Sequence, residues 1–379
     1  MAKRAIIYFG PRKAFDDLLR ASINSTCETT VSYLEAIRVY NARVKASDLA
    51  TRDLRLDAPD EVDNCIVYAE DFGSVLSHVI ANFNTILEET YEIGTLYIQN
   101  PPKRAFDSVY AAYSDGNVEV RYYEYPSIDK KALPGIYKSL KTGVLGQQTS
   151  KVALITSLYR LSVMKNEKPA VILMCGPSGV GKTETAKCLA KALGGGLTSI
   201  QFSMMQTNEA YEYLFGAEHS KASFARDLLN RESNVILIDE FDKANSGLYN
   251  MFYQLFDEGR YIDTNYDVDA RECLFLLTSN FQNENAARKA LGDAIYSRIS
   301  ACVCFEDLDE EAKVEIINRY YARLLSQLDD DDCEIINASG IKEWFVVNAG
   351  RYNNVRTMKA KIEKAVFEKL AARIFEELI

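Results

Sequence analysis

The segment GPSGVGKT, residues 176–183, combines three glycines with a lysine and a threonine at fixed spacing. It follows the apolar run VILMC (171–175) and precedes a helix-like segment, the strand, loop and helix order of a phosphate-binding loop. Glycines let the backbone curl around an anion with its N–H groups pointing inward, and the helix N-terminus adds positive potential. The sequence therefore predicts a nucleotide phosphate site built from Gly176, Pro177, Ser178, Gly179, Val180, Gly181, Lys182, Thr183 and Glu184.

Within this loop we expect Lys182 to reach the β- and γ-phosphates of ATP and Thr183 to ligate Mg²⁺. The run NVILIDEF then delivers Asp239 and Glu240 at the end of an apolar strand, where ligands gather in parallel sheets. Asp239 is predicted to hold Mg²⁺, directly or through water. Glu240 is predicted to polarise a water for attack on the γ-phosphate, so the sequence predicts ATP hydrolysis rather than binding alone.

A third polar strand end follows at TSN, residues 278–280. Its place after the acidic strand predicts that Asn280 orients the attacking water. The alternative is local, because a Ser or Asn after a strand is also commonly a cap or a turn residue.

The surrounding pattern predicts three domains. Residues 133–305 alternate helix-length segments with continuous apolar runs, which indicates a parallel α/β sheet covered on both faces. Residues 306–379 are helical in pattern, apart from a CEII run at 333–336 and a DDDD run at 329–332 that we interpret as a solvated turn. Residues 1–132 mix short β-like runs with helical patterns, which predicts a small α/β or α+β domain for partner or substrate recognition.

Several strings resemble the AAA+ superfamily and its Clp/Hsp100 branch, particularly the second ATPase module of that branch. They are VLGQ (144–147), LIDEFDKA (237–244) and FDEGRYIDTNYDVDARECLFLLTSN (256–280), and the resemblance covers residues 133–379. It implies a P-loop AAA+ parallel-sheet domain followed by a helical lid, and a homo-oligomeric ring, a hexamer, with ATP between subunits. It also implies Arg298 as an arginine finger reaching a neighbour's γ-phosphate and Arg356 as a second sensor, with Arg351 as a nearby alternative.

The stretch LFGAEHSKASFARDLL (214–229) lacks the glycine-flanked aromatic with which Clp-type unfoldases grip polypeptide. We expect Phe224 instead to lie on the apolar, packed face of the helix that follows this stretch. One interpretation is a protein-remodelling ATPase whose pore contacts come from His219 and Lys221, or from Tyr261 and Tyr266. The other is a non-threading switch or assembly factor acting on one dedicated protein partner. The resemblance favours remodelling.

Composition narrows the partners and the compartment. The chain of 379 residues carries a net charge of −10 and has no basic stripe, so nucleic acid is not an expected partner. No apolar stretch is long enough to span a membrane, and eight scattered cysteines without ligand spacing fit a reducing cytoplasm. Cys302 and Cys304 are expected to pack in the core rather than bind metal.

Overall fold

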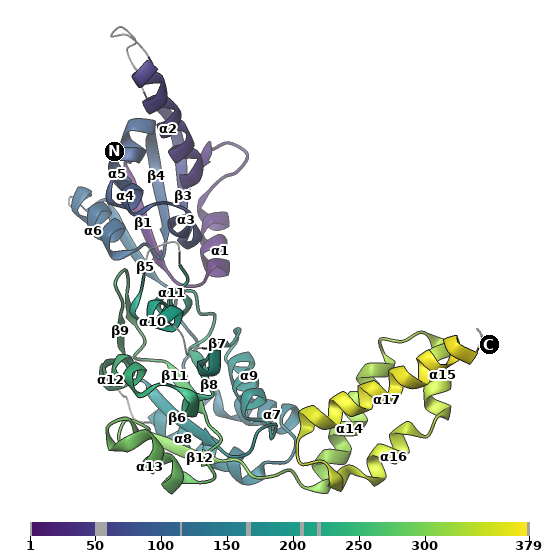
Figure 1. Ribbon diagram of the computed structural model, residues 1–379. Coiled ribbons are helices and arrows are strands. Elements are labelled where there is room, and N and C mark those ends of the chain that lie inside the picture. Colours follow the sequence, from purple (N-terminus) through teal and green to yellow (C-terminus); the bar gives the residue numbers. More distant parts are fainter. Residues whose placement is uncertain are drawn as a thin grey trace.

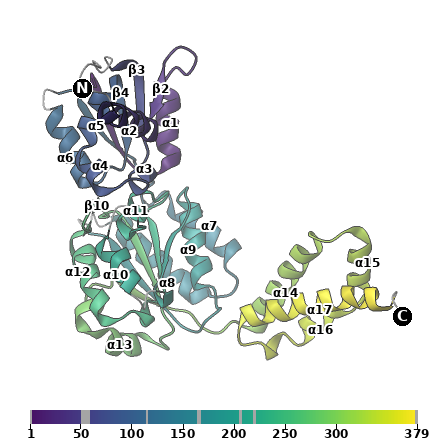
Figure 2. The ribbon, with the colours of Figure 1, turned by 45° about the horizontal axis from the view of Figure 1, so that its top comes forward.

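The computed structural model describes residues 2–49, 59–113, 116–163, 168–204, 208–217 and 221–376. Two α/β units follow one another along the chain, and a third, helical unit extends to one side, so that the molecule is L-shaped (Figures 1 and 2). The N-terminus lies in the first unit and the C-terminus at the far end of the helical unit.

The first unit is a five-stranded sheet in the order β2-β3-β4-β1-β5, and every strand pair is parallel. The unit is therefore α/β rather than α+β. Large side chains such as Tyr33, Phe72 and Phe83 are fully buried in its core. Its elements are β1 (Arg4–Phe9), α1 (Arg12–Ser22), β2 (Thr30–Ser32), α2 (Tyr33–Leu49), β3 (Asp60–Val67), α3 (Ala69–Gly73), α4 (Ser77–Ala81), α5 (Phe83–Thr90), β4 (Tyr91–Gln99), α6 (Lys103–Ala112) and β5 (Val118–Tyr122).

The second unit is also a parallel five-stranded sheet, in the order β12-β6-β11-β8-β7. Its central strands are apolar and buried at nearly every position, because helices cover both faces. The elements are α7 (Leu133–Gly143), α8 (Gln148–Val163), β6 (Ala170–Cys175), α9 (Lys182–Ala192), β7 (Thr198–Gln201), α10 (Asn208–Phe215), α11 (Phe224–Leu229), β8 (Val235–Asp239), α12 (Tyr249–Glu258), β11 (Leu274–Thr278), α13 (Glu284–Tyr296) and β12 (Ala301–Cys304). A separate antiparallel hairpin joins β9 (Arg260–Ile262) to β10 (Asp267–Asp269).

The two sheets share one topology. When the strands of each sheet are numbered in chain order, both sheets read 5-1-4-3-2. They differ after the first strand: only Gly10 and Pro11 separate β1 from α1, whereas residues 176–181 separate β6 from α9. The first unit thus has the same framework as the second without the phosphate-binding loop.

Four helices after β12 form the lid: α14 (Glu310–Leu325), α15 (Asp330–Ala338), α16 (Ile341–Val347) and α17 (Val355–Glu376). They enclose a small core that includes Ile317, Met358 and Ile362. The prediction of a solvated turn at DDDD is wrong, because Asp329 caps α15 through the N–H of Asp332 (2.8 Å). The next three aspartates form its first turn, where acids complement the helix dipole, and the CEII run is helical.

Two further predictions meet different outcomes. Phe224 is fully buried and lies against Tyr261, with ring centroids 4.9 Å apart, so its packing role is confirmed. Cys302 is half-buried, with its Sγ 3.4 Å from that of Cys175, but Cys304 is exposed, so core packing is wrong for Cys304.

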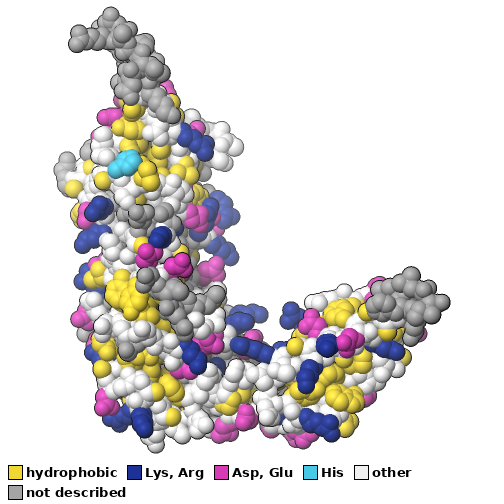
Figure 3. Space-filling model, viewed as in Figure 1, with side chains coloured by type: hydrophobic (Ala, Val, Ile, Leu, Met, Phe, Trp, Pro, Cys, Tyr) yellow, Lys and Arg dark blue, Asp and Glu magenta, His cyan; other side chains and the backbone are white. Residues whose placement is uncertain are grey.

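No helix in the described ranges combines the length and apolarity needed to cross a membrane. On the face shown in Figure 3, Lys and Arg side chains are interspersed with Asp and Glu, and basic side chains gather where the second unit meets the lid.

Candidate nucleotide-binding site

A cleft of about 520 Å³ lies between the carboxyl ends of β6, β8 and β11 and the lid. It brings together most of the residues that the sequence singled out. These are Ser178, Gly179, Val180, Gly181, Lys182, Thr183, Glu184, Asp239, Glu240, Asn280 and Arg356. Gly176, Pro177 and Arg298 do not line it.

The loop before α9 requires glycine at its first position. Gly176 has φ 126°, and a Cβ there would lie 2.1 Å from the carbonyl oxygen of Phe305 on the neighbouring chain segment. Gly181 caps α9 in a left-handed conformation. The ammonium of Lys182 donates to the carbonyl oxygens of Gly176 and, at 2.9 Å, of Pro177, so these two residues position the lysine from outside the cleft.

Lys182 is a buried cation among acids. Burial lowers the pKa of its ammonium below the ordinary 10.5, while the carboxylates of Asp242 and Asp239 oppose this shift. Asp242 Oδ1 is buried and has no hydrogen-bond partner within the described part of the chain. A cation or donor beside this atom would satisfy it, so the charge pattern fits bound Mg²⁺ and phosphate.

Thr278 joins the two acidic residues at the end of β8. Its hydroxyl donates to the carboxylate of Asp239 and accepts the backbone N–H of Glu240 at 2.9 Å. Glu240 adopts φ 56° and ψ 43°, a left-handed conformation that is uncommon for a residue with a side chain. The neighbouring strand therefore holds Glu240 in a backbone conformation that keeps it on the cleft.

Lid residues reach the phosphate-binding loop directly. The Asn354 amide donates to the carbonyl oxygen of Ser178 (3.3 Å), and its Oδ1 accepts the backbone N–H of Arg356 (2.8 Å). Arg356 lines the cleft together with Arg319, Arg323 and Lys359 from the lid, whereas Arg351 does not. The geometry favours Arg356 over Arg351 as the lid arginine that faces the nucleotide.

The far wall of the cleft is apolar and is fixed to the start of the lid. Val144, Leu145, Leu308 and Ile316 line it and could contact a nucleotide base. The adjacent Gln147 exchanges two hydrogen bonds with the backbone of Glu306, at 2.5 and 3.1 Å. A base bound against this wall would therefore contact both the second unit and the lid.

Arg298 lies away from the cleft of its own chain. Its guanidinium pairs with Asp257 at 2.6 Å and lies over the ring of Tyr253, 4.6 Å from the centroid. Both partners are on α12, so the arginine is held in place at the surface of the second unit.

Comparison with known proteins agrees with this geometry. The family model of the AAA domain (Cdc48 subfamily) matches residues 167–323. Residues 167–323 therefore form an AAA ATPase domain, and we call the second unit the AAA+ domain. The chain is 30% identical over 236 residues to a ClpA homolog protein of Fuscovulum blasticum, covering 55% of this chain and 30% of that protein. It is 25% identical over 281 residues to the chaperone protein ClpB of Wolinella succinogenes, covering 66% of this chain and 33% of that protein.

Solved structures extend the likeness in fold beyond the AAA+ domain. A closed-state reconstruction of Hsp104 with ATPγS and FITC casein matches 99% of this chain and 89% of that chain, at TM-score 0.53 and 14% identity. The S. cerevisiae Hsp104–ADP complex matches 65% of this chain and 49% of that one, at TM-score 0.51 and 21% identity. The chain spans about a third of the length of the curated relatives described above.

Three polar residues of the AAA+ site were not assigned from the sequence: Asp242, Thr278 and Asn354. Asp242 and Thr278 belong to the strings LIDEFDKA and TSN, and both strings carried the signal for a polar strand end. Asn354 had no such signal, because its contact with Ser178 spans 176 residues of chain.

The expected pore contacts fare differently. Tyr261 and Tyr266 are buried in the core of the AAA+ domain, so the proposal that they grip polypeptide is wrong. Lys221 pairs with Glu212, and His219 lies outside the described residues.

Proposed function

We propose that this protein is a cytoplasmic ATPase that assembles into a homo-oligomeric ring, a hexamer, and uses ATP hydrolysis to remodel or unfold protein clients. The observation that carries this proposal is the cleft itself, in which Lys182, Glu240 and Arg356 converge from the loop, the sheet and the lid. Similarity to ClpA and ClpB proteins supports the remodelling part.

The predicted site residues of the cleft have distinct roles in this reaction. Lys182 and the inward N–H groups of the loop bind the β- and γ-phosphates of ATP. Glu240 takes a proton from the attacking water, which the Asn280 amide orients. Mg²⁺, held by Thr183 and Asp239, would neutralise charge on the phosphate oxygens. Arg356 offsets charge from the side of the lid, so that hydrolysis changes how tightly the lid is held.

Arg298 is proposed to complete the cleft of a neighbouring subunit. Its fixed position against α12, outside its own cleft, supports a site shared between two subunits. A guanidinium that approaches from a second subunit stabilises the charge that develops on the transferring phosphoryl group. Hydrolysis would then depend on assembly.

The alternative is a non-threading switch that acts on one dedicated partner. A specific observation favours it: Gly216 and Ala217 are not followed by a glycine-flanked aromatic, and the two hairpin tyrosines are buried. The exposed aromatics of this region, Tyr211 and Phe215, stack on each other on α10, before Gly216 and not in the segment after it. A threading ATPase would therefore need a grip on polypeptide other than the usual aromatic after the Gly-Ala pair.

Purification of the Glu240→Gln form with ATP from its native cells separates the two functions. We expect this form to bind ATP, to turn it over very slowly, and to retain its clients, which mass spectrometry then identifies. Many unrelated polypeptides in low amounts support remodelling, and one stoichiometric partner supports the switch. Undiminished turnover by this form would remove Glu240 from the mechanism.

A further inference from the structure

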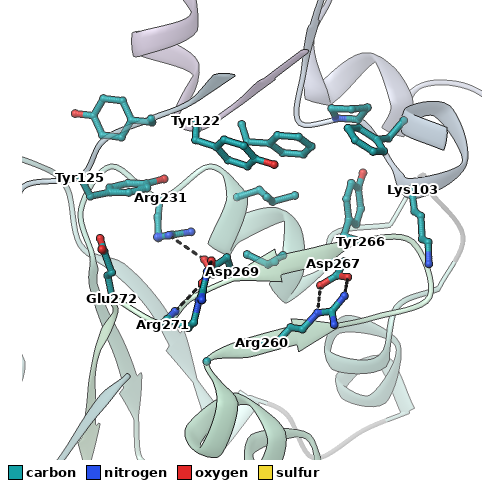
Figure 4. Close-up of a pocket in the computed structure, with 18 of the residues that line it drawn as sticks. Lys103, Tyr122, Tyr125, Arg231, Arg260, Tyr266, Asp267, Asp269, Arg271 and Glu272 are labelled. Carbon is teal, nitrogen blue, oxygen red and sulfur yellow. Dashed lines mark hydrogen bonds and ion pairs between the residues drawn. The ribbon is translucent and has the colours of Figure 1, made fainter. Parts of the chain in front are cut away.

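A second cavity, of about 1110 Å³, separates the first unit from the AAA+ domain (Figure 4). We call it the junction cavity; it shares no lining residue with the nucleotide cleft. The first unit contributes the ends of β1 and β5 and part of α6, and the AAA+ domain contributes Arg231, the β9–β10 hairpin and Glu272. Its volume lies just above the range for small-molecule pockets, about 300–1,000 Å³, so it has room for a larger ligand.

The two walls of the junction cavity are fixed to each other beside it. Asn100, at the end of β4, donates to the side chain of Asn230 in the AAA+ domain at 3.0 Å, and Gln99 donates to the same oxygen at 3.2 Å. The Asn100 side chain also accepts the backbone N–H of Gly10 and donates to the Gly10 carbonyl oxygen. These contacts occupy the carboxyl ends of β1 and β4, and the open junction cavity lies next to them.

Aromatic rings form the upper wall of the junction cavity. Tyr122 is stacked on Phe9, with centroids 5.3 Å apart, yet remains 68% exposed. Phe106 lies 5.9 Å from Phe9, and Tyr125 covers the guanidinium of Arg231 at 4.3 Å (Figure 4). Exposed ring faces in a concave site can bury apolar side chains of a ligand.

Some charged side chains that line the junction cavity form ion pairs and others do not. Arg260 pairs with Asp267 and Arg271 with Asp269 (Figure 4). Within the described residues, three exposed acids of the lining, Asp107, Glu258 and Glu272, have no ion-pair partner, against one exposed cation, Lys103. Arg231 also has no ion pair there, but it is buried and donates to the side chain of Asn234 and to the carbonyl oxygens of Leu228 and Asp269. Exposed acids beside ring faces complement a ligand that carries basic and apolar groups, and they disfavour a phosphate.

Two edge strands border the junction cavity: β5 is the last strand of its sheet, and β10 pairs only with β9. Unpaired backbone groups on such edges bind extended peptide. We propose that the junction cavity binds an extended polypeptide segment that carries aromatic or aliphatic side chains together with Lys or Arg. The proposal rests on the proposed function and names the site at which a protein client first binds.

The junction cavity is linked to the nucleotide cleft through two strands. It lies at the amino ends of β8 and β11, whose carboxyl ends carry Asp239 and Thr278. Arg231 donates to the side chain of Asn234 (3.0 Å), and the Asn234 carbonyl accepts the backbone N–H of Leu274 (2.7 Å), which fixes Arg231 to the start of both strands. Peptide that displaces Arg231 therefore shifts the residues that position the attacking water, and we expect it to change the ATPase rate.

The test uses the full chain and a fluorescein-labelled 12-residue peptide of Phe, Lys and Ser, with fluorescence anisotropy as the readout. We expect Tyr122→Ala to raise the Kd about tenfold and Glu272→Lys to raise it about fivefold. Tyr110→Ala is the control for the first variant, because Tyr110 is 56% exposed but does not line the cavity. Glu92→Lys, at the amino end of β4, is the control for the second.

Equal binding by all four variants would overturn the cavity proposal, as would equally tight binding of a peptide with Glu in place of Lys. The binding assay needs no hydrolysis, so the two proposals fail separately. A chain that binds the peptide at the cavity but hydrolyses no ATP would refute only the proposed function. ATP-driven unfolding that persists unchanged in Tyr122→Ala and Glu272→Lys would refute only the client site.

Discussion

Thr278 lines the nucleotide cleft and connects the two acidic residues at the end of β8, so we expect the geometry of hydrolysis to depend on it. It is 2% exposed, and its hydroxyl both donates to Asp239 and accepts the N–H of Glu240. The substitution Thr278→Val keeps the shape of the side chain and removes both hydrogen bonds. Asp239 then loses a donor and the left-handed backbone of Glu240 loses its restraint.

The size of the effect follows from these two bonds. A hydrogen bond to a charged group contributes about 1.5–3 kcal/mol, and a buried N–H without a partner costs about 1–3 kcal/mol. Because Glu240 can relax part of the second cost by moving, we expect the loss in the transition state to equal about one such bond. That loss lowers kcat by about tenfold to about a hundredfold.

The assay is steady-state ATP hydrolysis at saturating ATP with Mg²⁺ titrated, beside equilibrium binding of ATP. A positioning role predicts that Thr278→Val lowers kcat and shifts the Mg²⁺ dependence upward, while ATP affinity at high Mg²⁺ stays within about threefold. Thr278→Ser, which keeps the hydroxyl, is expected to retain most of the activity. If folded Thr278→Val has the kcat of the parent chain, the bridge to Asp239 and Glu240 does not position the catalytic groups.

Three further predictions concern nucleotide binding and assembly. Since burial lowers the pKa of Lys182 and only its charged form binds phosphate, kcat/KM for ATP is expected to fall on the alkaline side at a pH below 10.5; a decline that begins only above 10.5 contradicts this. Lys182→Ala and Arg298→Ala are each expected to be inactive alone. Mixed in equal amounts, they are expected to recover up to about a quarter of the activity, because random rings then contain sites with Lys182 from one subunit and Arg298 from its neighbour. No recovery would argue against a shared site. Calorimetry with a non-hydrolysable ATP analogue is expected to find one site per chain, which Lys182→Ala removes; a second site would place nucleotide in the first unit.

The parts of the nucleotide site that lie within short segments of the sequence could be predicted. The loop at 176–183 and the acids after β8 could be predicted because strand, turn and helix signals lie within about ten residues. Contacts between residues that are far apart in the sequence could not be predicted. Asn354 meets Ser178 only because the lid folds back, and Tyr261 is buried by a packing arrangement that residues 260–267 do not reveal alone. The strand order of the first unit was equally hidden, since crossover direction leaves no local pattern.

The two sheets share one strand order but differ in the loop after the first strand. This difference explains why the nucleotide cleft lies on the second sheet. A phosphate site needs a loop long enough to curl around the anion, and two residues between β1 and α1 are too few. The carboxyl edge of the first sheet is instead joined to the AAA+ domain through Asn100 and Asn230. That joint leaves the amino ends of β8 and β11 facing the junction cavity and their carboxyl ends facing the nucleotide cleft. Binding at either end therefore acts on the same two strands, and this is the route by which we propose that the first unit influences hydrolysis.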